Sequence, residues 1–445
     1  MMLSNELFPD IMPYKKGFLP VSEQHRLYFE ESGNSDGYPV VFLHEGPGAG
    51  CSSRVRRLFD PNFYRIILFD QRGAGRSEPV GCLDDNTTQH LVEDLEKLRQ
   101  HLHADQWVLV GEGWGCTLAL TYAVTYPCKV LGLILRSVFL GREAEKRWFY
   151  QAGGAHQFFP EAWEQFVELI PEQEQDDLIK AYYLRLTQGD EEEQGQAASA
   201  WNHWQTSTMP FEYRLGKFEA LEDRGKALSL ARIEAHYFAN NCFFESDDWL
   251  LTQVADKLQH LPCIIIHSRY DVVSPVQSAW DLAKVLPNAD LQILQSVGHT
   301  SHEACVIQGI ISATESFKDL YLQGKNKIAI DFDGVLHRYS KGWQDGSIYD
   351  DPIDGAREAM QRLKELGYYL IIFSTRANRI YRKKGHNPVR EMQQWLRKHQ
   401  IPYHEICTTG KPRAQIYVDD RALAFKGNWD DTVAQVQQFV VWRAK

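Results

Sequence analysis

Hydrophobic residues between positions 38 and 140 come in short runs that are separated by amphipathic segments. Four runs are typical of buried strands, and one long segment has the apolar stripe of a helix packed on one side. The strand candidates are "PVVFLH", "RIILFD", "WVLVG" and "VLGLILRS", and the helix candidate is "TTQHLVEDLEKLRQHL". Because strands alternate with helices, the pattern predicts an α/β fold with a parallel sheet covered on both faces.

The pattern then changes twice along the chain. Residues from about 142 to 249 are helical in pattern and rich in aromatic side chains, which we interpret as a helical lid inserted into the first domain. The acidic stretch "QGDEEEQGQAA" within it is expected to be a solvated loop. The strands resume with "PCIIIHS", and a second strand–helix series starts at "IAIDFDG". We therefore predict two domains, residues 1–322 and 323–445.

Composition narrows the class of protein. The chain has 445 residues, 44% of them hydrophobic, with a formal net charge of −11. This charge argues against nucleic acid and anionic membranes as partners. Without an 18-residue apolar run, a signal-like start or paired cysteines, the expectation is a reduced, cytoplasmic location. The oligomeric state stays open.

The stretch "GEGWG", residues 111–115, joins the strand "WVLVG" to the helix-like "CTLALTYAV". Its outline is that of a nucleophile elbow, G-x-S-x-G, in which a serine stands exposed between a strand and a helix. Gly113 occupies the position of that serine, and glycine has no atom that can attack a carbonyl. The pattern therefore indicates hydrolase architecture without the usual nucleophile.

Longer stretches resemble the proline iminopeptidases of the α/β-hydrolase superfamily, across roughly residues 14–318. They include "FDPNFYRIILFDQRGAGRSEP", "WFYQAGGAHQFFPEAW", "ARIEAHYF" and "HSRYDVVSP". The resemblance implies an α/β-hydrolase fold with a helical lid. It also implies that Asp271 and His299 are the aspartate and histidine of a catalytic triad.

Three positions depart from this family. Gly113 replaces the serine, and Glu45 puts a carboxylate in the loop that should stabilise a developing negative charge. Of the two lid acids that bind the substrate amine in the family, Glu234 matches one and Gln205 replaces the other. We therefore expect a pseudoenzyme site without aminopeptidase activity. Its vestigial residues are Gly113, Asp271, His299, Glu45, Glu112, Trp114, Glu234 and Gln205.

Other chemistry at this site stays open. Glu45 and Glu112 both replace family glycines, and with the aspartate–histidine pair they could hold a metal or a cationic group. The same pair could support hydrolase or lyase chemistry without a serine. A thiol nucleophile from Cys51 or Cys116 is a further alternative.

Acidic, hydroxyl and basic residues follow three predicted strands of the second domain. Because the carboxyl ends of parallel strands meet at one edge of a sheet, these side chains are expected to lie together. A carboxylate can accept a phosphoryl group, a second one can transfer a proton, and hydroxyl and ammonium groups can bind phosphate. The candidates are Asp331, Asp333, Ser374, Thr375, Arg376, Lys411, Asp419 and Asp420.

These motifs, in this order, resemble the haloacid dehalogenase superfamily of phosphatases, across roughly residues 327–439. The resemblance implies a Rossmann-like domain, here with little or no cap, and catalysis by Asp331, Asp333, Ser374 and Lys411. Arg376 and Thr375 are weaker phosphate-binding candidates. Mg²⁺ is the expected cofactor, held by Asp331, Asp333, Asp419 and Asp420.

The sequence as a whole thus favours a Mg²⁺-dependent phosphatase whose first domain binds or presents the substrate. Its substrate would be a phosphorylated small molecule, amino acid or peptide. Two alternatives remain: non-serine chemistry by His299 and Asp271, and a binding or scaffold protein with both sites silent.

Overall fold

The computed structural model describes residues 7–210, 223–323, 327–377, 387–408, 410–412 and 414–422. The chain forms two compact units, Met1–Phe317 and Lys318–Lys445. Each unit is described by itself. Among the described residues, no helix combines the length and the apolar composition needed to cross a bilayer.

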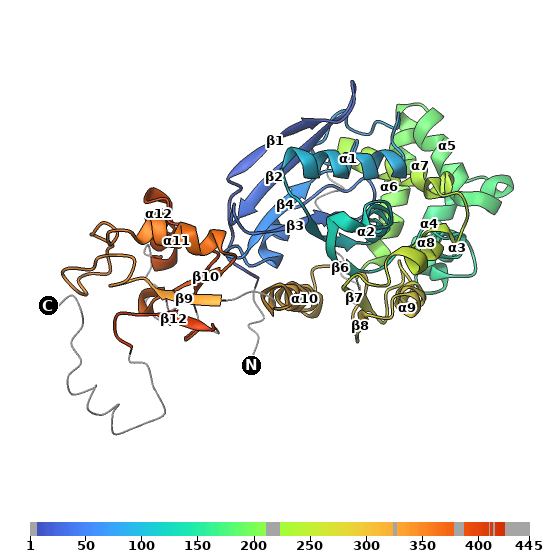
Figure 1. The fold of residues 1–445 in the computed structure, drawn as a ribbon. Coiled ribbons are helices and arrows are strands. Elements are labelled where there is room, and N and C mark those ends of the chain that lie inside the picture. Colours follow the sequence, from blue (N-terminus) through green and yellow to red (C-terminus); the bar gives the residue numbers. More distant parts are fainter. Residues whose placement is uncertain are drawn as a thin grey trace. The chain divides into compact units, whose positions relative to one another are not determined.

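The first unit is built on an eight-stranded sheet of order β1-β2-β4-β3-β5-β6-β7-β8 (Figure 1). Strands β3 to β8 pair in parallel, as the alternating pattern predicts. The antiparallel strands β1 and β2 at one edge were not predicted. The strands are β1 (Lys15–Pro20), β2 (Arg26–Gly33), β3 (Tyr38–Leu43), β4 (Tyr64–Phe69), β5 (Trp107–Glu112), β6 (Val130–Arg136), β7 (Cys263–Ser268) and β8 (Ala289–Leu294).

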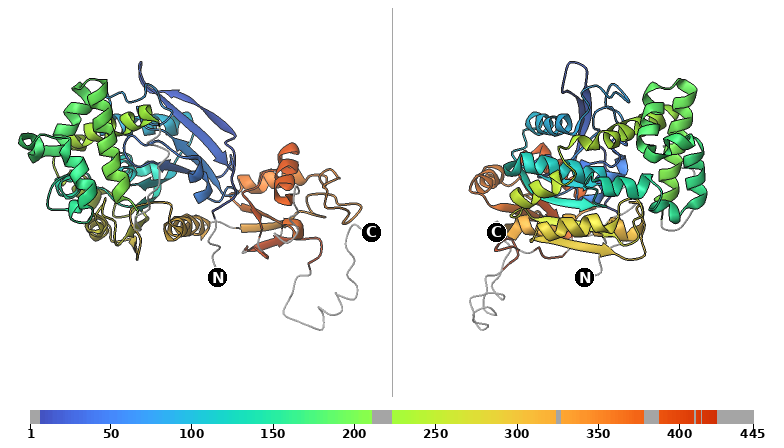
Figure 2. Two further views of the ribbon diagram at one scale, coloured as in Figure 1. Left: turned by 180° about the vertical axis from the view of Figure 1, so that it is seen from behind. Right: turned by 90° about the vertical axis from the view of Figure 1, so that its right-hand side faces the viewer.

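Helices cover this sheet and form the lid, whose green ribbons gather together in both views of Figure 2. One buried apolar cluster runs from β5 into the lid, so sheet and lid share a core. The sheet helices are α1 (Thr88–His101), α2 (Trp114–Thr125), α8 (Trp249–Lys257), α9 (Val276–Val285) and α10 (Ala304–Gln323). The lid helices are α3 (Glu143–Tyr150), α4 (Pro160–Glu168), α5 (Leu178–Gln188), α6 (Glu191–Thr208) and α7 (Arg224–Ala239).

The acidic stretch expected to be a loop is instead the start of α6. The Asp190 side chain caps the helix by accepting hydrogen bonds from the backbone N–H groups of Glu192 and Glu193, at 3.0 and 2.9 Å. Acidic side chains in a first turn are also favoured by the positive end of the helix dipole. The cluster of charges therefore marks a helix N-terminus.

The second unit contains a smaller, fully parallel sheet of order β11-β10-β9-β12. Its core joins the apolar residues of β9 and β10 to Met392 and Trp395 of a helix. The elements are β9 (Lys327–Asp331), α11 (Ala356–Glu365), β10 (Tyr369–Phe373), α12 (Pro388–Lys398), β11 (Glu405–Cys407) and β12 (Ile416–Val418).

Candidate functional site

The turn between β5 and α2 has the geometry of an elbow. Gly113 sits at φ 53° and ψ −117°, in a region that glycine enters at low cost. Its N–H donates to the carbonyl of Arg136 on β6 at 3.0 Å, and its own carbonyl accepts from the N–H of Cys116 at 3.0 Å. The elbow is therefore fixed by backbone bonds, and its tip carries no side chain.

Asp271 and His299 meet beside this elbow, after β7 and β8. The Nδ1 atom of His299 lies 2.9 Å from both carboxylate oxygens of Asp271. Burial raises the pKa of Asp271, but the charge and hydrogen bond of His299 outweigh it and hold this pKa well below its usual range. The ionised carboxylate orients the imidazole, so that its Nε2 atom is the one available for chemistry.

Glu45, just after β3, reaches toward the same histidine. Its Oε2 atom lies 3.7 Å from Nε2 of His299 and 3.9 Å from Nη1 of Arg136. A Cβ atom placed on Gly113 would lie 3.3 Å from Cβ of Glu45. The glutamate therefore stands beside the position where a serine side chain would project from the elbow.

Two buried ionisable residues, Glu112 and Arg136, adjoin Gly113. Burial raises the pKa of Glu112 to about 7, with Arg136 lowering it and Glu45 raising it further. Among the described residues, no hydrogen bond reaches any guanidinium nitrogen of Arg136, which is 1% exposed. Sequence reasoning missed Arg136, although a charged residue that ends the apolar run "VLGLILRS" was the available signal.

A cavity of about 110 Å³ lies between the lid and the elbow. Glu234 of α7 lines it, and its Oε2 atom accepts hydrogen bonds from Nε1 of Trp201 (2.8 Å) and from Nε2 of Gln205. Burial raises the pKa of Glu234 to about 7 against these hydrogen bonds. The structure thus brings Glu45, Gly113, Trp114, Gln205, Glu234 and His299 to the walls of one cavity.

The two cysteine candidates do not fit a nucleophile. The Cys51 thiol donates to the carbonyl of Phe69 at 3.2 Å, and the Cys116 thiol to the carbonyls of Gly111 and Arg136 at 3.2 and 3.1 Å. Burial raises both thiol pKa values well above the usual range. A thiolate is therefore disfavoured at either position.

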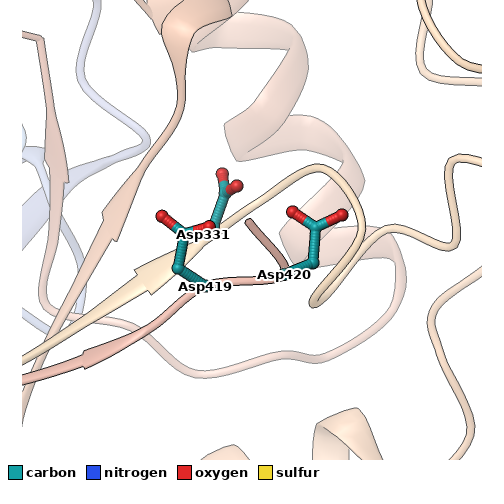
Figure 3. Close-up of side chains that lie close together, drawn as sticks. All are labelled: Asp331, Asp419 and Asp420. Atoms are coloured by element: carbon teal, nitrogen blue, oxygen red, sulfur yellow. The ribbon is translucent and has the colours of Figure 1, made fainter. Parts of the chain in front are cut away.

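In the second unit, three carboxylates lie together at the ends of β9 and β12 (Figure 3). One oxygen from each of Asp331, Asp419 and Asp420 lies within 4.8 Å of the others. Burial raises the pKa of Asp331 to about 7, and the charge of Asp419 raises it further. Like charges are therefore crowded at this edge of the small sheet.

Asp333 lies outside this group of three because its carboxylate has other partners. It accepts from Nε and Nη2 of Arg376 at 2.7 and 2.8 Å, and from Oγ of Ser374 at 3.1 Å. His337 Nδ1 lies 2.9 Å away on the same carboxylate. Burial raises the pKa of Asp333, but the bonds from His337 and Arg376 lower it below its usual value.

Two further predicted residues of the second unit, Thr375 and Lys411, have different surroundings. Thr375 opens a short 3₁₀ helix, Thr375–Ala377, that directly follows β10. Lys411 is exposed, with its Nζ atom 4.3 Å from the centre of the Tyr417 ring. Their predicted roles in binding a ligand stay predictions.

Comparisons with known proteins bear on the first unit. Residues 38–304 match the family model described as alpha/beta hydrolase fold. The chain is 49% identical over 320 residues to a probable proline iminopeptidase of Leptolyngbya boryana, covering 72% of this chain and 99% of that protein. It is 49% identical over 315 residues to a proline iminopeptidase of Arabidopsis thaliana, covering 71% and 82%. A proline iminopeptidase of Xylella fastidiosa is 47% identical over 311 residues, covering 70% and 99%.

These relatives confirm the predicted α/β-hydrolase fold and the resemblance to proline iminopeptidases. They contradict the functional prediction. A Mg²⁺-dependent phosphatase with phosphorylated substrates and a pseudoenzyme first unit is wrong, because relatives that cover about 70% of the chain are named for peptidase activity. The physical reason for the error is that acids at strand ends also arise as capped, paired or solvated groups. Their spacing alone does not specify phosphoryl transfer.

Proposed function

Because the chain belongs to the proline iminopeptidases of the α/β-hydrolase fold, we propose that its first unit hydrolyses peptide-like substrates with a free amino-terminal residue, proline first among them. The observation that carries this proposal is the pair formed by Asp271 and His299, joined at 2.9 Å. His299 of this pair lines the cavity, and so does Glu234.

We take Gly113 to stand where the family has its serine, so an acyl-enzyme cannot form there. Water is then the nucleophile. The Nε2 atom of His299 can accept a hydrogen bond from the attacking water, with the imidazole held by Asp271. The N–H of Trp114, the residue after the elbow tip Gly113, is the donor that this fold uses for the oxyanion.

Glu234 is the proposed partner of the substrate amine. Two of its donors, Trp201 and Gln205, bind the same oxygen atom, Oε2, so that Oε1 can accept a bond from an ammonium group. Bringing a cation into contact with a buried carboxylate favours its ionised form. The cavity of about 110 Å³ has room for a small residue such as proline.

The test is release of the amino-terminal residue from prolyl-4-nitroanilide and from prolyl dipeptides by the full chain. His299→Ala is expected to lower kcat/KM by about 10²-fold, because it removes the group that binds and orients the attacking water. His260→Ala, an exposed histidine of the same unit, is the matched control and should change it less than twofold. Wild-type protein that releases no product, or equal rates in both variants, would overturn the proposal.

For the second unit we infer a Rossmann-like fold of the haloacid dehalogenase type without a large cap, and a divalent cation, Mg²⁺ first, held by Asp331, Asp419 and Asp420. The support is the crowding of their oxygens within 4.8 Å, since hard cations prefer carboxylate oxygens. Asp331→Asn should abolish heat of Mg²⁺ binding in calorimetry, whereas exposed Asp354→Asn should retain it. Equal binding in both variants would exclude this site.

A further inference from the structure

We propose that Glu45 is the catalytic base of the first unit and takes the proton of the attacking water. The proposal rests on the function proposed above and adds the residue that activates the water. Its evidence is the position of the Glu45 carboxylate, whose Oε2 atom lies 3.7 Å from Nε2 of His299 at the wall of the same cavity.

Glu45 and Gly113 fit each other sterically. A Cβ atom on residue 113 would approach Cβ of Glu45 to 3.3 Å, which is closer than ordinary carbon contacts. A serine at the elbow would therefore crowd the glutamate, while the glycine leaves room for it. The two departures from the family pattern form one matched change, in which a carboxylate takes the place beside the elbow.

A water molecule at this place would have two acceptors for its two O–H groups. Since Oε2 of Glu45 and Nε2 of His299 are 3.7 Å apart, one water oxygen can lie within hydrogen-bond distance of both. Asp271 fixes the imidazole through Nδ1, so the Nε2 lone pair faces this water. The histidine then orients the water, and the glutamate accepts its proton.

The charge of Glu45 would oppose an oxyanion if the carboxylate stayed ionised. When Glu45 takes up the proton of the water, its negative charge is lost and no longer opposes the oxyanion. As the water oxygen forms its bond to the carbonyl carbon, one O–H bond breaks, the proton passes to Glu45, and the carbonyl electron pair moves to oxygen. Glu45 is neutral when the oxyanion is present, and the guanidinium of Arg136 lies 3.9 Å from its Oε2 atom.

The second half of the reaction returns the proton. The oxygen electron pair re-forms the carbonyl, the C–N bond breaks, and the leaving nitrogen takes the proton from Glu45. The products are a carboxylic acid and an amine, water is the one co-substrate, and Glu45 is regenerated as a carboxylate.

The test compares Glu45→Gln and Glu45→Gly with wild type on prolyl-4-nitroanilide across pH. Both variants should lower kcat about 100-fold, with KM changed less than threefold, because the lost group acts on the water. Formate should restore part of the activity of Glu45→Gly, since it can enter the space of the lost carboxylate.

Exposed Glu161→Gln is the matched control and should retain wild-type kcat. If Glu45 were only an unfavourable charge, both substitutions would raise kcat, and that result would overturn the proposal. Turnover that depends on His299 but not on Glu45 would overturn it while leaving the hydrolase function standing. Wild-type protein without turnover would overturn both.

Discussion

The two candidate sites use acidic residues in opposite ways. In the first unit, Asp271 is paired with a histidine at 2.9 Å, and its pKa is held below the usual range. In the second unit, Asp331 lies with two other carboxylates, and its pKa is raised to about 7. A paired carboxylate orients its partner, whereas crowded carboxylates favour a proton or a cation between them. The comparison shows that the neighbouring groups of a carboxylate set its pKa and therefore its role in a site.

The strongest test of the first site places a serine at the tip of the elbow. Gly113→Ser combined with Glu45→Gly should raise kcat/KM on prolyl-4-nitroanilide by about 10²–10³-fold over wild type, because a serine beside His299 can form an acyl-enzyme. Gly113→Ser alone should gain little, since its Cβ atom would crowd Glu45 at 3.3 Å. A burst of nitroaniline release would report the acyl-enzyme. A double variant no faster than wild type would show that the elbow is not correctly placed for a serine.

A second test removes the arginine that binds the carboxylate of Asp333 in the second unit. Arg376→Met should lower the free energy of unfolding of the second unit by about 3 kcal/mol, because it removes the bidentate partner of the Asp333 carboxylate, whose side chain is only 13% exposed. Urea unfolding followed by tryptophan fluorescence measures this change. Arg338→Met, which removes an ion pair with a largely exposed Asp354, should cost less than about 0.5 kcal/mol. Equal costs would mean that the buried pair adds nothing beyond an exposed one.

Binding of the substrate amine by Glu234 is expected to depend on pH. With its pKa raised to about 7, Glu234 is protonated at lower pH and ionised at higher pH, so KM for an ammonium substrate should fall as pH rises through about 7. Glu234→Gln should raise KM about thirtyfold at pH 8 and flatten this dependence. Steady-state kinetics between pH 5.5 and 8.5, with exposed Glu164→Gln as control, checks both effects. A KM that is independent of pH in wild type would place the substrate amine elsewhere.

The smallest expected effect comes from removing one of the crowded carboxylates of the second unit. Asp419→Asn removes one of three neighbouring negative charges, and without divalent cations it should stabilise the second unit by about 0.5–1 kcal/mol. The same substitution should weaken Mg²⁺ binding. Urea unfolding with and without EDTA separates the two effects. A loss of stability in EDTA would contradict the view that these carboxylates repel one another.

Much of the first unit could be predicted from the sequence because its signals are local. The parallel strands β3 to β8 follow buried apolar runs, and the elbow follows from glycine spacing between a strand and a helix. Strand β1 was missed because most of its residues are exposed, and β2 was missed because its buried positions include the polar residues Glu30, Glu31 and Ser32. The start of α6 was missed because a run of acids looks solvated, although Asp190 caps a helix there.

The predicted phosphatase function was wrong because it depended on a short motif in the second unit. The acids at the strand ends of the second unit form an ordered motif, but the relatives named for peptidase activity match about 70% of the chain. Asp333 illustrates the limit of the motif. Its carboxylate is bound by Arg376, Ser374 and His337, a set of partners that spacing along the chain could not reveal.

The sequence by itself determined the α/β pattern, the elbow with Gly113 at its tip, and the identity of Asp271 and His299 as a candidate pair. These features depend on residues that are neighbours along the chain or that match a family motif. Tertiary structure alone decided that Glu45 stands beside both His299 and the elbow glycine, with Arg136 buried next to it. These groups come from the ends of different strands, and only the packing of the sheet brings their atoms within a few ångströms of one another.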